Sequence, residues 1–213
     1  MLECLFPAEV VTVEADEATW QVPLHPEEEA ELGRVSDTRR RDFEAGRACA
    51  RVALDRLGLP PGPLLRHADR SPRWPPGAVG SISHCPKFCA AAVGRSGRYA
   101  ALGLDVERAG RARPELARRI CTPRERAALP SLGAEALGIV FSIKEAVYKA
   151  WHPRTGAAFG FQDVEVGLEL EAGRFLARVD AKSAPAIEGR REVEGRFAVS
   201  AEHVAAGLAI PRG

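Results

Sequence analysis

The chain has 213 residues, of which 46% are hydrophobic and 28% are charged, and its formal net charge is +1. These values exclude a disordered chain and a strongly basic nucleic-acid-binding molecule, and the length allows one domain or two small ones. No apolar run approaches the roughly 20 residues of a membrane span. The acidic N-terminus lacks the basic start of a signal peptide, and the five cysteines lack disulfide-framework spacing. We therefore expect a cytoplasmic monomer that binds neither membranes nor nucleic acid.

The first half of the chain predicts one long helix followed by short strands. The helix covers residues 37–57, with Asp37 or Thr38 as its N-cap and Gly58 as its end. Two proline-rich loops, "LPPGP" and "HADRSPRWPPG", separate it from the strands. The strand candidates span residues 78–83, 88–94 and 99–107.

The second half predicts helices before strands. Helical patterns cover residues 113–120, 123–129 and 133–151. Strand patterns then follow near residues 161–170, 173–180, 193–200 and 203–210. This order of elements predicts a compact α+β protein with a boundary near residue 100, which separates an N-terminal half, residues 1–100, from a C-terminal half, residues 101–213.

The stretch "GLDVE" places two carboxylates on one face of a predicted strand. Asp105 and Glu107 are two residues apart, which is roughly 7 Å in strand geometry. Like charges at this spacing repel each other, and a hard cation would reverse the repulsion. The alternative is the solvated face of an edge strand.

The stretch "FSIKEAVYKA" predicts a helix with one apolar and one polar face. At 100° per residue, the apolar face carries Ile143, Ala146, Val147 and Ala150. Ser142, Glu145 and Lys149 fall together on the other face. Glu145 and Lys149 could form an ordinary i,i+4 surface pair, worth a few tenths of a kcal/mol, or they could belong to a site.

An arginine interrupts the apolar stripe of the 37–57 helix. Arg47 lies within the stripe formed by Phe43, Ala50 and Leu54, where a guanidinium needs an anion. A phosphate would suit its fork. The alternatives are a side chain that extends to solvent or an internal carboxylate partner.

The stretch "GSISHC" ends a predicted strand with small hydroxyls and a histidine. Ser81, Ser83 and His84 precede a turn at Pro86, and such groups can form an anion site or simply end a strand. The sequence contains no Walker loop, GxGxxG, GxSxG or HExxH pattern, so the common catalytic templates are absent.

Taken in order, "GSISHC", "GLDVE" and "FSIKEAVYKAW" resemble the signature of the 4′-phosphopantetheinyl transferases. The sequence is most similar to the group typified by enterobactin synthetase component D and the actinobacterial enzymes. Further similarity runs through "RRRDFEAGRACARVALDRLG", "WPPGAVGSISHC" and "GFQDVEV", and so covers most of residues 36–170.

The resemblance implies transfer of the 4′-phosphopantetheine arm of coenzyme A to a serine of an apo acyl or peptidyl carrier protein, with release of 3′,5′-ADP. It also implies two similar α+β halves related by a pseudo-twofold axis, with the active site between them. Carrier proteins of siderophore, polyketide, nonribosomal-peptide and fatty-acid biosynthesis are the expected class of partner.

The resemblance also implies roles for individual residues. Mg²⁺, or Mn²⁺ in its place, would be held by Asp105, Glu107 and Glu145, with Glu107 binding through water. Glu145 would accept the serine proton, directly or through water. Lys144 and Lys149 would contact the diphosphate. The remaining coenzyme A contacts would be Arg39, Arg47, Arg66, Ser83 and His84.

Two readings from other classes compete with this one. The first is a non-catalytic nucleotide or anion-binding module of the same fold, in which Asp105 and Glu107 are structural. The second is a nucleic-acid binder that uses the arginine cluster between Arg34 and Arg51. The presence of Lys149 together with all three carboxylates favours the enzyme.

Overall fold

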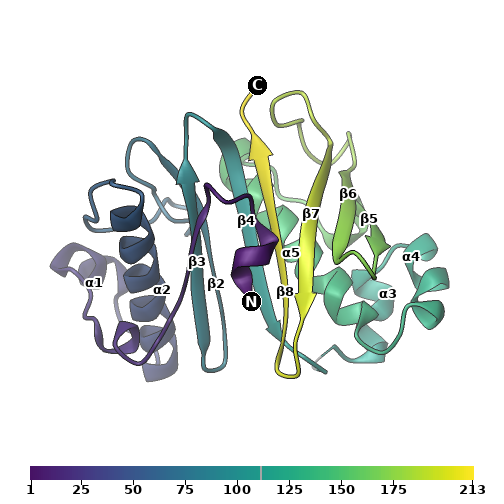
Figure 1. The fold of residues 1–213 in the computed structure, drawn as a ribbon, viewed down its shortest axis with the longest axis horizontal. Helices are drawn as coiled ribbons and strands as arrows, with labels where there is room; N and C mark the ends of the chain where they lie inside the picture. Colours follow the sequence, from purple (N-terminus) through teal and green to yellow (C-terminus); the bar gives the residue numbers. More distant parts are fainter. Residues whose placement is uncertain (111) are drawn as a thin grey trace.

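A computed structural model describes residues 1–110 and 112–213 of the chain, and its strands form two antiparallel sheets (Figure 1). The first sheet has the order β1-β3-β2, with β1 (Val11–Glu14), β2 (Ala78–Cys85) and β3 (Phe88–Arg95). The second has the order β4-β8-β7-β6-β5, with β4 (Tyr99–Arg108), β5 (Val164–Glu169), β6 (Arg174–Val179), β7 (Glu192–Val199) and β8 (His203–Pro211).

One 20-residue helix packs against each sheet. Helix α2 (Asp37–Arg56) covers the first sheet, and α5 (Ala136–Thr155) covers β4 and β8 of the second, as Figure 1 shows. The shorter helices are α1 (Pro26–Leu32), α3 (Ala117–Ile120) and α4 (Pro123–Ala128). Single 3₁₀ turns are η1 (Leu2–Leu5), η2 (Thr19–Gln21), η3 (Pro114–Leu116), η4 (Leu129–Ser131) and η5 (Phe161–Asp163). No helix in the described part of the chain is long and apolar enough to cross a membrane.

Most predicted elements are present, with differences at their ends. Ser36, and not Asp37 or Thr38, caps α2, since its hydroxyl accepts a hydrogen bond from the backbone N–H of Arg39 at 3.3 Å. The predicted 133–151 helix begins at Ala136 and continues to Thr155. The predicted 161–170 strand begins only after the 3₁₀ turn η5. Helix α1 and strand β1 were not predicted.

The two sheets meet where β2 lies beside β4, and serine side chains join them. The backbone N–H of Leu104 donates to Ser81 Oγ at 3.0 Å, and that of Val106 donates to Ser83 Oγ at 3.1 Å. The edge of β4 that faces away from β2 is paired with β8. The hydroxyls therefore satisfy an otherwise open strand edge, because buried backbone N–H groups need acceptors.

The second sheet is covered on both faces. On one face, the N-terminal residues pack closely, because a Cβ added at Gly207 would lie 2.8 Å from the Phe6 ring. On the other, α5 packs so tightly that a Cβ at Gly103 would lie 2.0 Å from the backbone oxygen of Ala146. The first residues of the chain thus cover the sheet of its second half. The predicted division at residue 100 stays a prediction.

Candidate active site

The close packing of α5 on β4 brings the two predicted motifs together. Gly103 makes this possible, since any side chain there would collide with the helix backbone at Ala146. Glu145 precedes Ala146 and Lys149 lies one turn further along the helix, while Asp105 follows Gly103 on the same face of the strand. The polar face of α5 is therefore directed at the strand carboxylates.

Asp105 lies at the centre of the cluster and is 3% exposed. Its Oδ1 accepts hydrogen bonds from Lys149 Nζ at 2.7 Å and from Ser83 Oγ at 3.2 Å. Lys149 Nζ also donates to Ser83 Oγ at 3.0 Å. Asp105 Oδ2 is buried and has no hydrogen-bond partner among the described residues. A buried carboxylate oxygen without a partner is costly, so this atom indicates a ligand.

Glu145 lies near this cluster in a partly buried position. Burial raises the pKa of Glu145, the negative charge of Asp105 raises it further, and Lys149 lowers it. Glu107 lines a neighbouring cavity of about 720 Å³ together with His84. Within the described residues, no three Asp, Glu, His or Cys side chains already converge as a metal cage. The ligand role predicted for Asp105, Glu107 and Glu145 thus stays a prediction.

His84 is held neutral between a cation and a carboxylate. Arg39 Nη1 lies 3.0 Å from His84 Nε2, and a guanidinium only donates, so Nε2 is the acceptor and the ring proton is on Nδ1. His84 Nδ1 then faces Asp42 Oδ2 at 3.4 Å. Desolvation by the surrounding chain lowers the pKa of His84, Asp42 opposes this, and Arg39 adds to it. The sequence analysis assigned no role to Asp42, although it lies in the stretch "RRRDFEAGRACARVALDRLG".

Arg47 is buried in α2, and no carboxylate of the described residues is in contact with it. Its Nε donates to the backbone oxygen of Leu64 at 2.9 Å, its guanidinium lies 4.0 Å above the Phe43 ring, and its Nη2 has no partner in the described part of the chain. Arg66 lies over the same ring at 5.2 Å and contacts Glu31. Burial lowers the pKa of Arg47 to about 10, and the charge of Arg66 acts in the same direction. The positive charges of Arg47 and Arg66, together with the unused Nη2 donor of Arg47, favour the binding of an anion at this place.

Comparison with known proteins places these features in a family. Residues 27–94 match the 4′-phosphopantetheinyl transferase N-terminal domain, and residues 101–205 match the 4′-phosphopantetheinyl transferase superfamily. The chain is 39% identical to 4′-phosphopantetheinyl transferase Svp of Streptomyces mobaraensis, over 99% of this chain and 89% of that one. The chain belongs to the 4′-phosphopantetheinyl transferase superfamily.

Other relatives agree. The 4′-phosphopantetheinyl transferase PptT of Mycobacterium tuberculosis is 39% identical over 72% of this chain and 71% of its own. Enterobactin synthase component D of Escherichia coli K12 is 34% identical over 64% of this chain and 66% of its own. The predicted resemblance is confirmed, as are the α+β class with two domains and the assignment as an enzyme that transfers phosphopantetheine to carrier proteins.

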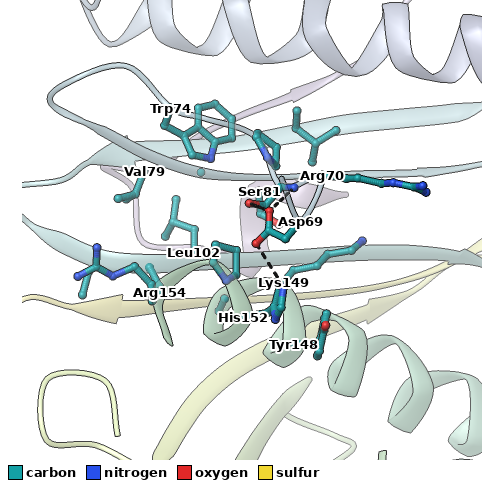
Figure 2. A pocket seen from close by; sticks show the side chains of 18 residues that line it. Asp69, Arg70, Trp74, Val79, Ser81, Leu102, Tyr148, Lys149, His152 and Arg154 are labelled. Carbon is teal, nitrogen blue, oxygen red and sulfur yellow. Dashed lines mark hydrogen bonds and ion pairs between the residues drawn. The ribbon is translucent and has the colours of Figure 1, made fainter. Parts of the chain in front are cut away.

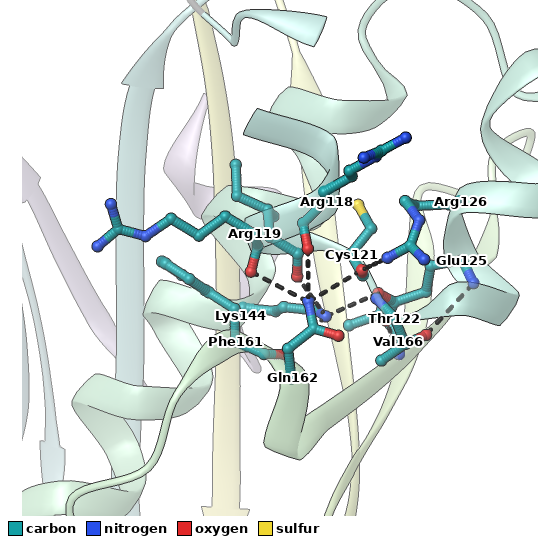
Figure 3. A network of polar contacts seen from close by, with 11 residues as sticks. Arg118, Arg119, Cys121, Thr122, Glu125, Arg126, Lys144, Phe161, Gln162 and Val166 are labelled. Carbon is teal, nitrogen blue, oxygen red and sulfur yellow. Dashed lines mark hydrogen bonds and ion pairs between the residues drawn. The ribbon is translucent and has the colours of Figure 1, made fainter. Parts of the chain in front are cut away.

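Lys144 of this transferase does not fit the predicted contact with the diphosphate. Its side chain is 1% exposed, and its Nζ contacts three internal acceptors (Figure 3). These are the backbone oxygens of Ile120 and Phe161, each at 2.9 Å, and Glu125 Oε2 at 2.7 Å. All three ammonium protons are therefore used. Lys144 anchors α3, α4 and η5 to α5, and we remove it from the proposed site.

A second cavity, of about 290 Å³, is lined in part by Lys149 (Figure 2). Its walls come from β2, β4, α5 and the loop before β2, and they include Trp74, Leu102 and Tyr148. Sequence reasoning assigned no function to "HADRSPRWPPG", because its proline and serine residues indicate only a turn. The one available signal was Trp74, an aromatic residue in an otherwise polar loop.

Proposed function

We propose that the seam between β2, β4 and α5 binds the diphosphate of coenzyme A together with a divalent metal ion. The observation that carries the proposal is Asp105, a buried carboxylate with one oxygen bonded to Lys149 and one without a partner within residues 1–110 and 112–213. Oxygen ligands from both a strand and a helix suit Mg²⁺, and Mn²⁺ accepts the same ligands. Asp105 and Glu145 would bind the ion directly, and Glu107 through water.

A metal ion at this place would neutralise charge on the diphosphate. Lys149 lies where it can leave Asp105 and contact the phosphoryl group that is transferred, since its side chain is 28% exposed. Ser83, fixed by the N–H of Val106, presents its hydroxyl beside the same point. The protein thus supplies prearranged charge for an in-line displacement, which is the main source of rate in phosphoryl transfer.

The proton of the carrier serine needs an acceptor, and we assign that role to Glu145. The serine oxygen forms a bond to the β-phosphorus of coenzyme A, and the bond from that phosphorus to the leaving 3′,5′-ADP breaks. The serine proton passes to Glu145, directly or through water. Burial and the charge of Asp105 raise the pKa of Glu145, which makes its carboxylate a better base than an exposed one.

The arginines of the first half would bind the 3′-phosphate. Arg47 offers a free Nη2, and Arg66 shares its aromatic neighbour. Arg39 contacts His84, whose Nε2 is an acceptor in the absence of ligand. A phosphate that approached Arg39 would compete with His84 for the same guanidinium protons, so His84 is freed to turn or to take up a proton and donate.

The test is incubation with coenzyme A, Mg²⁺ and a panel of apo acyl and peptidyl carrier domains, followed by intact-mass measurement. The expected result is a phosphopantetheine mass gain on the carrier serine that is lost in excess chelator and in Glu145→Gln. Transfer that persists undiminished in chelator would refute the metal site. The panel also identifies the carrier class, and size-exclusion measurement tests the expected monomer.

A further inference from the structure

Two side chains from opposite halves of the protein meet at the wall of the cavity beside Lys149. Asp69 Oδ2, in the loop before β2, lies 3.3 Å from His152 Nε2 on α5, and Figure 2 shows the contact. Both residues line the 290 Å³ cavity, as does Lys149. The contact therefore joins a loop of the first half to the helix that carries the proposed catalytic groups.

The loop presents Asp69 in a fixed orientation. Asp69 Oδ1 accepts hydrogen bonds from the backbone N–H of Ser71 at 2.9 Å and from Ser71 Oγ at 2.6 Å. The backbone N–H of His67 donates to the Ser71 oxygen at 2.9 Å, and that of Arg70 donates to the His67 oxygen at 2.9 Å. With one carboxylate oxygen used inside the turn, Oδ2 is directed at α5.

His152 is held as firmly on the other side. Its Nδ1 lies 3.0 Å from the backbone oxygen of Ala157, and its ring stacks on Tyr148 with 5.0 Å between centroids and 9° between planes. Both ring nitrogens thus face acceptors, a carbonyl at Nδ1 and a carboxylate at Nε2. Only the doubly protonated imidazolium donates to both, because the neutral ring has one N–H.

We propose that Asp69 and His152 form a positioning pair that holds the loop of residues 65–73 against α5. The pair so keeps in its binding form the 290 Å³ cavity, which we assign to coenzyme A because Lys149 lines it. The proposal rests on the proposed function, because Lys149 links this cavity to the diphosphate site. When the pair is formed, the loop and α5 already line the cavity before coenzyme A binds. When it is broken, the loop must be ordered on binding, and that ordering weakens the binding of coenzyme A.

The pair contacts neither Asp105 nor Glu145, so its loss acts on binding and leaves the chemical step unchanged. In His152→Phe, which keeps a ring against Tyr148, we expect KM for coenzyme A to rise about 3- to 10-fold with kcat unchanged. Asp69→Asn should give the same result by removing the carboxylate. The matched control is Glu192→Gln, which breaks the exposed Arg178–Glu192 pair far from the cavity and should leave KM unchanged.

His152→Gln separates an ionic pair from a merely structural contact. Glutamine offers Asp69 an uncharged N–H, whereas the imidazolium of the wild type offers a charged one, and salt screens only the charged contact. The other charged side chains around the same cavity, Arg70, Lys149 and Arg154, are present in both proteins. The ratio of KM in wild type to KM in His152→Gln should therefore rise with ionic strength.

The experiment is steady-state transfer to an apo carrier domain with coenzyme A varied, together with calorimetric titration of coenzyme A and thermal unfolding of each variant. An unchanged KM in folded His152→Phe and Asp69→Asn overturns the proposal, and so does an equal rise in Glu192→Gln. A KM ratio that does not change with ionic strength overturns the ionic pair. If the wild type makes no holo-carrier product, the proposed function fails instead, and the two failures are distinct.

Discussion

Replacement of Arg47 tests the proposed 3′-phosphate site most directly. Arg47 is 5% exposed, and its Nη2 is a buried donor that none of the residues described by the structure accepts from. Arg47→Met keeps most of the apolar stem and removes the charge and the unused donor. Only the 3′-phosphate distinguishes coenzyme A from 3′-dephospho-coenzyme A, so the variant should discriminate between these two substrates.

The expected size follows from one charge-assisted hydrogen bond. Such a bond contributes about 1.5–3 kcal/mol, which corresponds to about a 10- to 100-fold change in binding. The variant also loses the Nε bond to the Leu64 oxygen, worth about 1 kcal/mol of folding stability, and the contact with the Phe43 ring. Against these losses, repulsion between Arg47 and Arg66 disappears. We therefore expect a folded protein of moderately reduced stability.

The assay measures kcat/KM for coenzyme A and for 3′-dephospho-coenzyme A, and the quantity of interest is their ratio. In Arg47→Met the ratio should fall by about 10- to 100-fold, which is the value of the lost contact. The control is Arg56→Met, which changes an exposed arginine in the last turn of the same helix. An unchanged ratio in well-folded Arg47→Met would show that Arg47 does not contact the 3′-phosphate and that the reasoning from its unpaired donor is wrong.

Three further predictions concern the seam and the helix that lines it. Asp105→Asn should abolish metal-dependent transfer, and isothermal titration should show weaker Mg²⁺ binding in the presence of coenzyme A; equal metal affinity would count against Asp105 as a ligand. Glu145→Gln and Lys149→Ala should each lower kcat by about 100-fold or more with little change in KM, whereas a change in KM alone would make them binding groups. Lys144→Met should reduce the free energy of unfolding by about 3–5 kcal/mol, because it leaves Glu125 buried without its cation. Chemical denaturation measures this free energy, and Lys182→Met, at an exposed lysine, is the control. A loss of stability near zero in Lys144→Met would contradict the prediction.

The sequence predicted the elements whose residues alternate or repeat clearly. The sequence did not predict α1, because the inward-facing residue of this helix, Glu28, is a carboxylate. Helix α1 directs Glu28 inward, where it is 0% exposed and bonded to Arg51 at 2.8 Å and to the backbone N–H of Leu64 at 2.8 Å. A helix whose inward position is a carboxylate has no apolar stripe, so periodicity could not identify it.

The site residues that lie on the polar face of a single strand or helix were predictable, and contacts between distant segments were not. Asp105 was identified from its strand face and Glu145 from its helix face, because local geometry determines such faces. The pair of Asp69 and His152 joins positions far apart in the chain, and neither residue belongs to a motif. The free oxygen of Asp105 and the free donor of Arg47 are also properties of packing. A pattern indicates which groups are polar, and only the fold shows which of them lack partners.

The two lysines of "KEAVYK" point in different directions from the axis of α5. Lys144 and Lys149 are five residues apart, which on a helix of 100° per residue places them about 140° apart. One helix face cannot carry both toward the same diphosphate. Lys149, one turn after Glu145, faces Asp105, and Lys144 therefore points into the packing between α5, α4 and η5, where Glu125 and two backbone oxygens bind it. Lys149 is therefore the lysine placed to stabilise charge at the site, and Lys144 is the lysine that stabilises the fold. The angle between them around the helix axis is enough to predict that the two lysines have different roles.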